Sequence, residues 1–203
     1  SPVTAYGVYQ GMKAAAKFKW GSDSLKGRKI LVQGVGHVGE HLIKYLTIEG
    51  ASVLIDEINK SRSEEIAIKY GVRPVSTKNV YELDIDIYSP CALGGTLKPE
   101  TIAMLKCQIV AGAANNQLEH ESRDALLLHE KGILYAPDFL INAGGLISVY
   151  AEIQGYDKQE TMSKTKEIYN TTIEIFTTAD MENITPHDAA LKIAQERVDA
   201  VKI

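Results

Sequence analysis

The stretch Lys29–Asn59, KILVQGVGHVGEHLIKYLTIEGASVLIDEIN, decides the fold of this chain. It opens with a β-prone run at Ile30–Val32, passes through a glycine-rich segment, and then shows the apolar periodicity of a helix that ends at Gly50. A second apolar run at Val53–Ile55 follows and leads into two acids. Strand, glycines, helix, strand and terminal acid within about 30 residues are the pattern of a dinucleotide-binding βαβ unit.

Each glycine of the pattern has a physical role. Gly34 permits the tight turn, Gly36 lets the backbone approach a pyrophosphate, and Gly39 lets the helix pack closely on the strand. The helix that follows offers unpaired N–H groups and the positive end of its dipole to the phosphates. We therefore expect these glycines, with His37 and Val38 between them, to form the cofactor's phosphate loop.

The two acids that end the second strand are Asp56 and Glu57. A carboxylate at this place accepts hydrogen bonds from the adenosine ribose, which favours NAD over NADP. The next arginine in the chain is Arg62, so nothing beside the acids suits a 2′-phosphate. The predicted cofactor is NAD, and the choice between the two acids is open at this point.

Two other interpretations of the same residues remain. The segment His37–His41, HVGEH, matches the HxxEH pattern of zinc proteases, but that pattern needs a third ligand and an uninterrupted helix, whereas Gly39 lies within it. Alternatively, the glycines only make a tight strand-to-helix turn in another kind of α/β protein. The acid at the expected spacing favours the dinucleotide site, and we predict no metal site.

Length and composition are those of a globular domain. A chain of 203 residues suits one domain, with or without an appended subdomain, and 45% apolar and 24% charged residues are ordinary values. The net charge of −4 gives no reason to expect nucleic acid or an anionic membrane as a partner. No apolar run has the length of a membrane span. Cys91 and Cys107 form neither a metal-binding nor a disulfide pattern, so we expect a cytoplasmic protein.

Strands alternate with helices along the rest of the chain. Helices are predicted at residues 2–19, about 64–70 with Ser61 or Ser63 as cap, about 99–106 and about 119–131. Strands are predicted at 72–75 (an edge strand), 84–88, 108–110 and 133–135. Such alternation implies a parallel sheet with right-handed crossovers. The predicted fold class is therefore α/β, a Rossmann-type doubly wound, mostly parallel sheet with helices on both faces and extra C-terminal helices.

The last three strands each end in a loop of small residues, at 89–95, 111–116 and 136–145. Ligands of such sheets bind beyond the carboxyl ends of the strands, on the side where the phosphate loop opens. We therefore expect a cofactor cleft there, although any single loop of this kind is explained by a tight turn alone.

The C-terminal part is predicted to be helical, at about 140–155 and 157–181 and from Thr185, the expected cap, with Pro186 in the first turn. Apolar periodicity predicts the buried stripe of the last helix, which consists of Ala190, Ile193, Ala194, Val198 and Val201. Residues 1–20 and about 158–203 are expected to be helical flanks that pack on the domain.

Several further motifs carry a resemblance that covers nearly the whole chain. They are Ser1–Gly7 (SPVTAYG), Gln33–Gly39 (QGVGHVG), Ile58–Lys60 (INK), Pro90–Gly95 (PCALGG), Asn116–Leu118 (NQL), Tyr135–Asp138 (YAPD) and Ile141–Gly145 (INAGG). Together they resemble the amino-acid dehydrogenases that act on glutamate, leucine, phenylalanine and valine, and most closely the NAD-binding domain of the leucine-specific members. The resemblance implies that residues 1–203 are this domain. The family's other domain, with the catalytic acid–base lysines, would then precede Ser1, so we expect no catalytic residue in this chain.

The resemblance also implies roles for residues at the cofactor. Thr4 would bind the nicotinamide carboxamide, and Glu57 rather than Asp56 aligns with the ribose acid. Cys91 and Ala92 would line the nicotinamide ribose.

At the substrate, the resemblance implies that Asn116 faces both substrate and cofactor at the reacting centre, and that Asn142 lies beside the nicotinamide. Leu146 and Val149, which are one helical turn apart, match the apolar wall for the substrate side chain. Ordinary core packing is the alternative explanation of this apolar pair.

The implied activity is the NAD-dependent oxidative deamination of a branched-chain, leucine-like L-amino acid to its 2-oxo acid and ammonia, in a homo-oligomeric enzyme. Specificity for phenylalanine or valine is the alternative within the family. A stand-alone NAD-binding module without chemistry is the alternative outside it.

Overall fold

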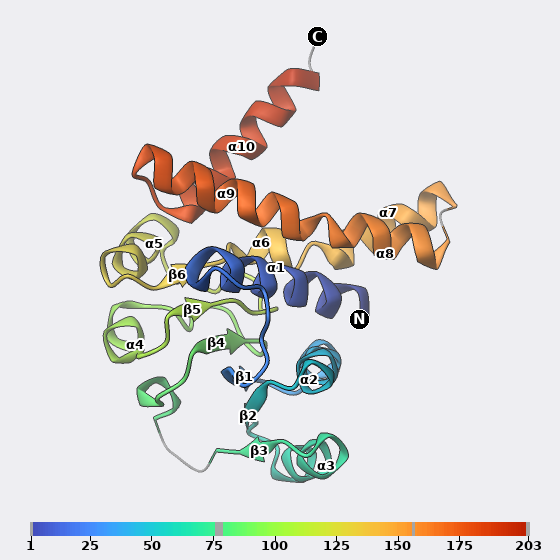
Figure 1. The fold of residues 1–203 in the computed structure, drawn as a ribbon, viewed down its shortest axis with the longest axis vertical. Coiled ribbons are helices and arrows are strands. Elements are labelled where there is room, and N and C mark those ends of the chain that lie inside the picture. The colour runs from blue at the N-terminus through green and yellow to red at the C-terminus, as the bar shows by residue number, and fades with distance from the viewer. Residues whose placement is uncertain (1, 76–78, 156, 202–203) are drawn as a thin grey trace.

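The computed structural model describes residues 2–75, 79–155 and 157–201, and a six-stranded parallel sheet lies at its centre (Figure 1). The strand order is β3-β2-β1-β4-β5-β6. The strands are β1 Lys29–Gln33, β2 Ser52–Asp56, β3 Arg73–Pro74, β4 Ile87–Pro90, β5 Ile109–Val110 and β6 Leu134–Tyr135. This order is that of doubly wound dinucleotide-binding folds, so the predicted Rossmann-type class is confirmed.

Helices cover both faces of the sheet (Figure 1). They are α1 Pro2–Trp20, α2 His37–Glu49, α3 Lys60–Tyr70, the 3₁₀ helix η1 Val80–Glu82, α4 Pro99–Met104, α5 Glu121–Glu130, α6 Asp138–Ile141, α7 Gly144–Gln154, α8 Lys158–Lys166, α9 Ile168–Glu182 and α10 Pro186–Val201. The long α9 lies above α1, and α10 projects away from the rest of the molecule.

Alternate residues of each central strand enter two separate hydrophobic cores. In β1, Ile30 and Val32 pack with α1, α2, α3 and α9, whereas Leu31 packs on the opposite face with η1, α4 and α5. The pair Ile87 and Tyr88 divides in the same way in β4. Because both faces are covered, these strands are apolar runs with no solvent-facing side.

Three predictions, of a helix cap, of the limits of a strand and of a buried stripe, are wrong. The cap of α3 is Asn59, whose side chain accepts a hydrogen bond from the Arg62 N–H, and neither Ser61 nor Ser63 has this role. The predicted strand 84–88 is shifted to Ile87–Pro90, because Asp84 and Asp86 stay at the sheet's N-terminal rim. There the Asp84 carboxylate binds the Lys29 ammonium, and the Asp86 carboxylate accepts the Lys29 N–H.

The third concerns α10. Its predicted buried stripe extends only to Ile193, and Ala194 and Val198 are exposed because the helix leaves the body beyond that point. The side chain of Val201 lies outside the described residues. The predicted cap is confirmed, since the Thr185 hydroxyl accepts the Asp188 N–H at 3.1 Å.

The long C-terminal helices are each divided in two. The predicted helix 140–155 is α6 and α7, with Asn142 between them, and the predicted helix 157–181 is α8 and α9, which meet at Glu167. The break at Asn142 matters for the site, because it places a polar side chain at the start of α7.

Candidate functional site

The predicted glycine loop joins β1 to α2, and the three glycines differ in what surrounds them. Gly34 has φ +95° and lies against Ala92, so that an added Cβ would approach the Ala92 Cβ to 2.6 Å. A Cβ on Gly39 would overlap the Gly34 carbonyl oxygen. Around Gly36, in contrast, no heavy atom of the described residues lies within 4 Å of the place of a Cβ, apart from Gly36 itself and its neighbours in the chain. The first and third glycines thus serve packing, and the second leaves open space at the N-terminus of α2.

Two acids end β2, and their carboxylates have different partners. Asp56 accepts a hydrogen bond from the Gln33 side-chain amide at 2.9 Å. Glu57 accepts two backbone N–H groups, from Val35 at one oxygen and from Asn59 at the other, each at 2.9 Å. Glu57 is therefore fastened directly to the glycine loop.

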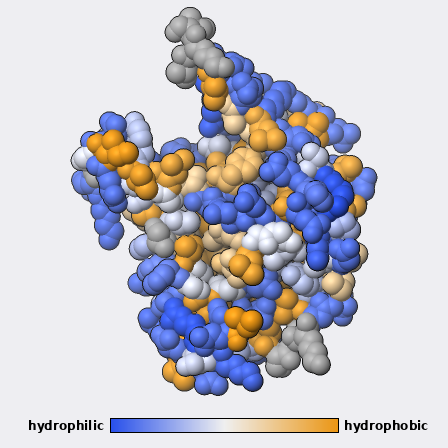
Figure 2. Space-filling view, turned by 180° about the vertical axis from the view of Figure 1, so that it is seen from behind, coloured by the Kyte–Doolittle hydropathy of each residue, from blue (hydrophilic) through white to orange (hydrophobic). Residues whose placement is uncertain are grey.

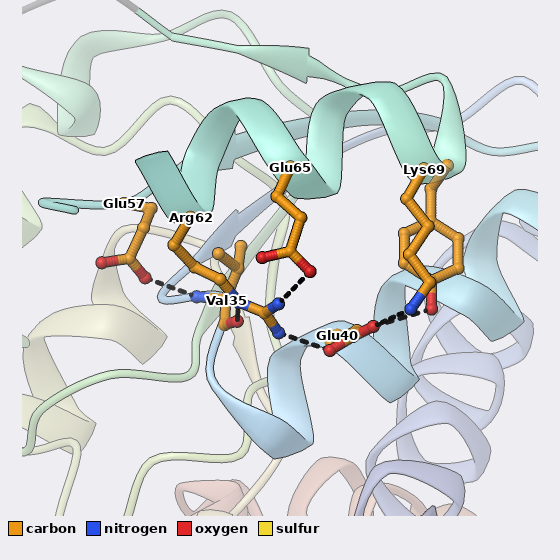
Figure 3. A network of polar contacts seen from close by, with 7 residues as sticks. Val35, Glu40, Glu57, Arg62, Glu65 and Lys69 are labelled. Carbon is orange, nitrogen blue, oxygen red and sulfur yellow. Dashed lines mark hydrogen bonds and ion pairs between the residues drawn. The ribbon is translucent and has the colours of Figure 1, made fainter. Parts of the chain in front are cut away.

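Arg62 also reaches this loop, as Figure 3 shows. Its Nε donates to the Val35 carbonyl oxygen at 3.2 Å, one Nη donates to Glu65 at 2.9 Å, and the other forms an ion pair with Glu40. The expectation that no arginine lies near the acids is thus corrected. The side chain of Arg62, in the first turn of α3, points back toward the helix N-terminus and so covers ground before its own position.

Glu40 is the centre of the contact between α2 and α3. Besides Arg62, it accepts hydrogen bonds from the Lys69 ammonium at 2.8 Å and the Tyr70 hydroxyl at 3.1 Å. Hydrogen bonding to Lys69, aided by Arg62 and Tyr70, lowers the pKa of Glu40 from 4.5 to about 2, against the opposing effect of partial burial. A carboxylate with these partners is part of an ion-pair network.

Two cavities flank the glycine loop. The smaller one, of about 220 Å³, is lined by both acids, by Gly34 and by Ala92. The larger one, of about 610 Å³, is lined by Val38 of the loop and by side chains from α1 and from the loops that follow β5 and β6. Four predicted site residues besides Val38 line the larger cavity: Thr4, Asn116, Asn142 and Leu146.

The two asparagines of the larger cavity are placed by their backbone. Asn116 has φ +52°, the left-handed conformation that asparagine tolerates better than most residues, and it lies in a bend of the loop after β5. Asn142 follows α6, and its side-chain amide donates to Asn115 at 2.6 Å and to the Ala113 carbonyl oxygen at 3.4 Å. These bonds link the loop after β5 to the loop after β6.

The apolar pair on α7 is not part of the hydrophobic core. Leu146 is 73% exposed at the rim of the larger cavity, and Val149 is 54% exposed one turn further on. Tyr150 and Ile153 are exposed on the same helix. In Figure 2, apolar side chains gather on the lobe that α7 and α8 form. Within this chain, therefore, the pair is not explained by packing in the core.

The predicted pair after β4 divides between two places. Ala92 lines the smaller cavity, next to the acids, whereas Cys91 packs beneath the loop, 3.7 Å from the place of a Cβ on Gly39. Burial raises the pKa of the Cys91 thiol, so the thiol stays protonated. His37 is an exposed first residue of α2.

Within the described parts of the chain, no group of three or more His, Cys, Asp or Glu side chains is arranged to hold a metal ion. Glu40 of the HVGEH segment is instead engaged by Arg62, Lys69 and Tyr70. Of the helices described, none combines the length and the apolar character that a membrane crossing requires.

Comparisons with known proteins agree with this geometry. Residues 54–202 match the family model of glutamate/leucine/phenylalanine/valine dehydrogenases. The chain is 46% identical over 202 residues to a leucine dehydrogenase of Thermoactinomyces intermedius, with 100% of this chain and 55% of that protein covered. A phenylalanine dehydrogenase of the same organism is 45% identical over 197 residues, with 96% and 54% covered.

The chain also resembles an amino-acid dehydrogenase of known structure. The L-tryptophan dehydrogenase of Nostoc punctiforme superposes with a TM-score of 0.95 at 42% identity, over 98% of this chain and 60% of that one. This chain therefore spans little more than half the length of the relatives that it matches. It belongs to the glutamate/leucine/phenylalanine/valine dehydrogenase family.

Proposed function

We propose that this chain is the NAD-binding domain of an amino-acid dehydrogenase that oxidatively deaminates a leucine-like L-amino acid. The observation that carries the proposal is the position of the glycine loop between two cavities, one with the acids and the other with Thr4, Asn116 and Asn142. A dinucleotide has this shape, with an adenosine ribose and a nicotinamide on either side of a pyrophosphate.

The residues present fit such a cofactor. The open space at Gly36 lies at the N-terminus of a 13-residue helix, where unpaired N–H groups favour phosphate. Glu57 lines the smaller cavity and is held by the loop, so it is our candidate for the acid that binds the ribose hydroxyls. A carboxylate at this place disfavours a 2′-phosphate, which supports NAD over NADP.

In the larger cavity, this chain would position the reactants. Thr4 and Asn142 would orient the nicotinamide, Asn116 would face the substrate, and Leu146 would contact its side chain. When bound, the nicotinamide ring supplies the hydride acceptor. Holding it at a fixed place beside the substrate removes the entropy cost of bringing the reactants together. The acid–base lysines would come from a part of the enzyme outside this chain, and the complete enzyme would be a cytoplasmic homo-oligomer.

A titration of the purified chain with NAD tests the cofactor assignment, and an assay with leucine, valine, phenylalanine and NAD tests the absence of catalytic groups. We expect binding without turnover. The variant Gly36→Val is the control, because its side chain fills the open space at the helix N-terminus and should weaken NAD binding. Clear turnover by the chain alone would place the catalytic groups within it, and absence of NAD binding would refute the cofactor assignment.

A second candidate is phenylalanine as substrate. It is favoured by the 45% identity to a phenylalanine dehydrogenase, which is nearly the identity to the leucine dehydrogenase. Relative kcat/KM values for leucine and phenylalanine, measured on the complete enzyme, distinguish the two.

A further inference from the structure

The backbone of Val35, between the first two glycines of the loop, is bound by two charged side chains, one at its N–H and one at its carbonyl oxygen (Figure 3). Its N–H donates to the Glu57 carboxylate, and its carbonyl oxygen accepts from Arg62 Nε. Glu57 and Arg62 carry opposite charges and bind the backbone of the same residue. The guanidinium of Arg62, however, forms its ion pairs with Glu40 and Glu65 instead of Glu57.

The Glu57 carboxylate occupies a site that suits an anion in general. It accepts two backbone N–H groups, from Val35 and Asn59, and it lines the cavity that we propose for the adenosine ribose. Two N–H groups that converge on one anion, with an arginine bound to the neighbouring carbonyl oxygen of Val35, are the elements of a 2′-phosphate site. In this chain the two N–H groups bind the carboxylate of Glu57, and the guanidinium of Arg62 is held by ion pairs with Glu40 and Glu65.

The two ion pairs of Arg62 contribute differently to holding its guanidinium. The side chain of Glu65 is 57% exposed and lies three residues away on the same helix, and such a pair contributes little. The side chain of Glu40 is 17% exposed and belongs to α2, so its pair with Arg62 is shielded from water and joins two elements. Glu40 therefore sets the position of the guanidinium.

We propose that Glu40 is a specificity-determining positioning residue, which excludes NADP by keeping Arg62 away from the ribose 2′ position. The proposal rests on the proposed binding of a nicotinamide dinucleotide at this loop. Two acids thus contribute to the discrimination between NAD and NADP. Glu57 repels the 2′-phosphate, and Glu40 binds Arg62, whose positive charge would otherwise offset that repulsion.

The test is a double-mutant cycle of Glu57→Ser and Glu40→Gln, with the affinities of AMP, adenosine 2′,5′-bisphosphate, NAD and NADP as readouts. The second substitution, added to Glu57→Ser, should raise the affinity for the two ligands with a 2′-phosphate by about tenfold or more, as expected for a new hydrogen bond to a charged group. The affinities for AMP and NAD should change far less. With Glu57 intact, Glu40→Gln alone should give no such gain.

Two controls identify the route. Adding Arg62→Gln to the double variant should abolish the gain, and Glu65→Gln in place of Glu40→Gln should give little of it. A melting curve monitors folding, and Glu40→Asp, which retracts the charge by one methylene group, replaces Glu40→Gln if the latter does not fold. An equal NADP-to-NAD ratio in Glu57→Ser with and without the substitution at Glu40 would overturn the proposal. Failure of the unmodified chain to bind NAD would refute the proposed function instead.

Discussion

At the scale of single residues, Glu57 has a structural role in the glycine loop besides its proposed role at the ribose, and only the second was predicted from the sequence. Its carboxylate accepts N–H groups from Val35 and Asn59, so it shapes the glycine loop, and it also lines the cavity proposed for the ribose. Asp56, one residue earlier, is instead bonded to the Gln33 amide within the sheet. The structure thus separates two neighbouring acids that spacing alone left equivalent.

The variant Glu57→Ser should therefore weaken NAD binding more than NADP binding. The 2′- and 3′-hydroxyls of the adenosine ribose of NAD lose their acceptor. In NADP the 2′ position carries the phosphate, so at most a bond to the 3′-hydroxyl is lost, and the phosphate is relieved of a like charge. A hydrogen bond to a charged group corresponds to about 1.5–3 kcal/mol, which is a change of about tenfold or more in the ratio. Isothermal titration with both cofactors measures it, and Asp56→Ser is the matched control. A change of preference in the control, and none in Glu57→Ser, would move the role to Asp56.

At the scale of elements, the tie between α2 and α3 depends on the charge of Glu40. Its pKa is lowered to about 2 from 4.5, chiefly by the hydrogen bond from Lys69. A lowered pKa in the folded state means that the ionised form stabilises the fold. This stabilisation is complete above about pH 4.5 and is lost as the pH falls from there through about 2.

Urea unfolding of the unmodified chain and of Glu40→Gln at several pH values measures this contribution. The variant lacks the ionisable group, so we expect it to be less stable near neutral pH, with the difference shrinking as the pH falls from 4.5 toward 2. A difference in unfolding free energy that stays constant over this range would show that Glu40 acts through packing and not through its charge.

The helix α7 presents its apolar side chains to solvent, which makes Leu146 a test of the proposed substrate wall. In the complete enzyme, Leu146→Ala should shift relative kcat/KM from leucine toward phenylalanine, since it widens the pocket, by about 1–3 kcal/mol. Because Leu146 is 73% exposed in this chain, the melting temperature of the chain should hardly change. Val149→Ala should give a smaller shift, because Val149 does not line the cavity in this chain. An unaltered ranking of substrates in Leu146→Ala would remove it from the pocket.

Local signals account for what could be predicted at these two scales. The glycine loop and the helix start at Pro186 follow from backbone rules that act over a few residues, and both are confirmed. The limits of α10's buried stripe could not be predicted in this way. Apolar periodicity continues to Val198, but burial depends on whether another element is present to pack against the helix, and beyond Ile193 α10 projects from the body.

The part of Arg62 was missed for a similar reason. Sequence distance from Glu57 suggested that it was remote, although the first turn of a helix directs side chains backward, toward the loop that precedes it. The partner on α2 that fixes it, Glu40, is 22 residues away in sequence. No local pattern pairs two such residues, so this contact required the tertiary structure.

At the scale of the whole molecule, the first helix is packed against segments from the far end of the chain. Small residues on α1 allow the close approach: a Cβ on Gly7 would lie 2.7 Å from the Ile141 carbonyl oxygen, and a Cβ on Gly11 would overlap the Ile141 side chain. A Cβ on Gly144 would lie 2.4 Å from the Val3 carbonyl oxygen. This contact sets the distance between Thr4 and Asn142, which are far apart in the sequence and both line the larger cavity.

Gly11→Ala therefore sets two known effects against each other. Alanine in a helix interior is favoured over glycine by about 1 kcal/mol. Overpacking of a filled interior costs about 1–3 kcal/mol, and here the added methyl group would meet not only the Ile141 Cγ2 atom but also its Cβ, at 2.8 Å, which no rotamer change can move away. We expect the packing cost to prevail, so that the free energy of unfolding in urea decreases.

The double variant Gly11→Ala/Ile141→Ala identifies the cause of that decrease. Ile141→Ala alone leaves a cavity and should cost about 2–5 kcal/mol. In the double variant the new methyl group enters part of this cavity. The loss of unfolding free energy in the double variant should therefore be smaller than the sum of the two single losses, by at least about 0.5 kcal/mol. A gain in stability for Gly11→Ala alone, as at an exposed helix position, would mean that α1 and α6 are not held together by this contact. The position of Thr4 beside Asn142 would then need another explanation.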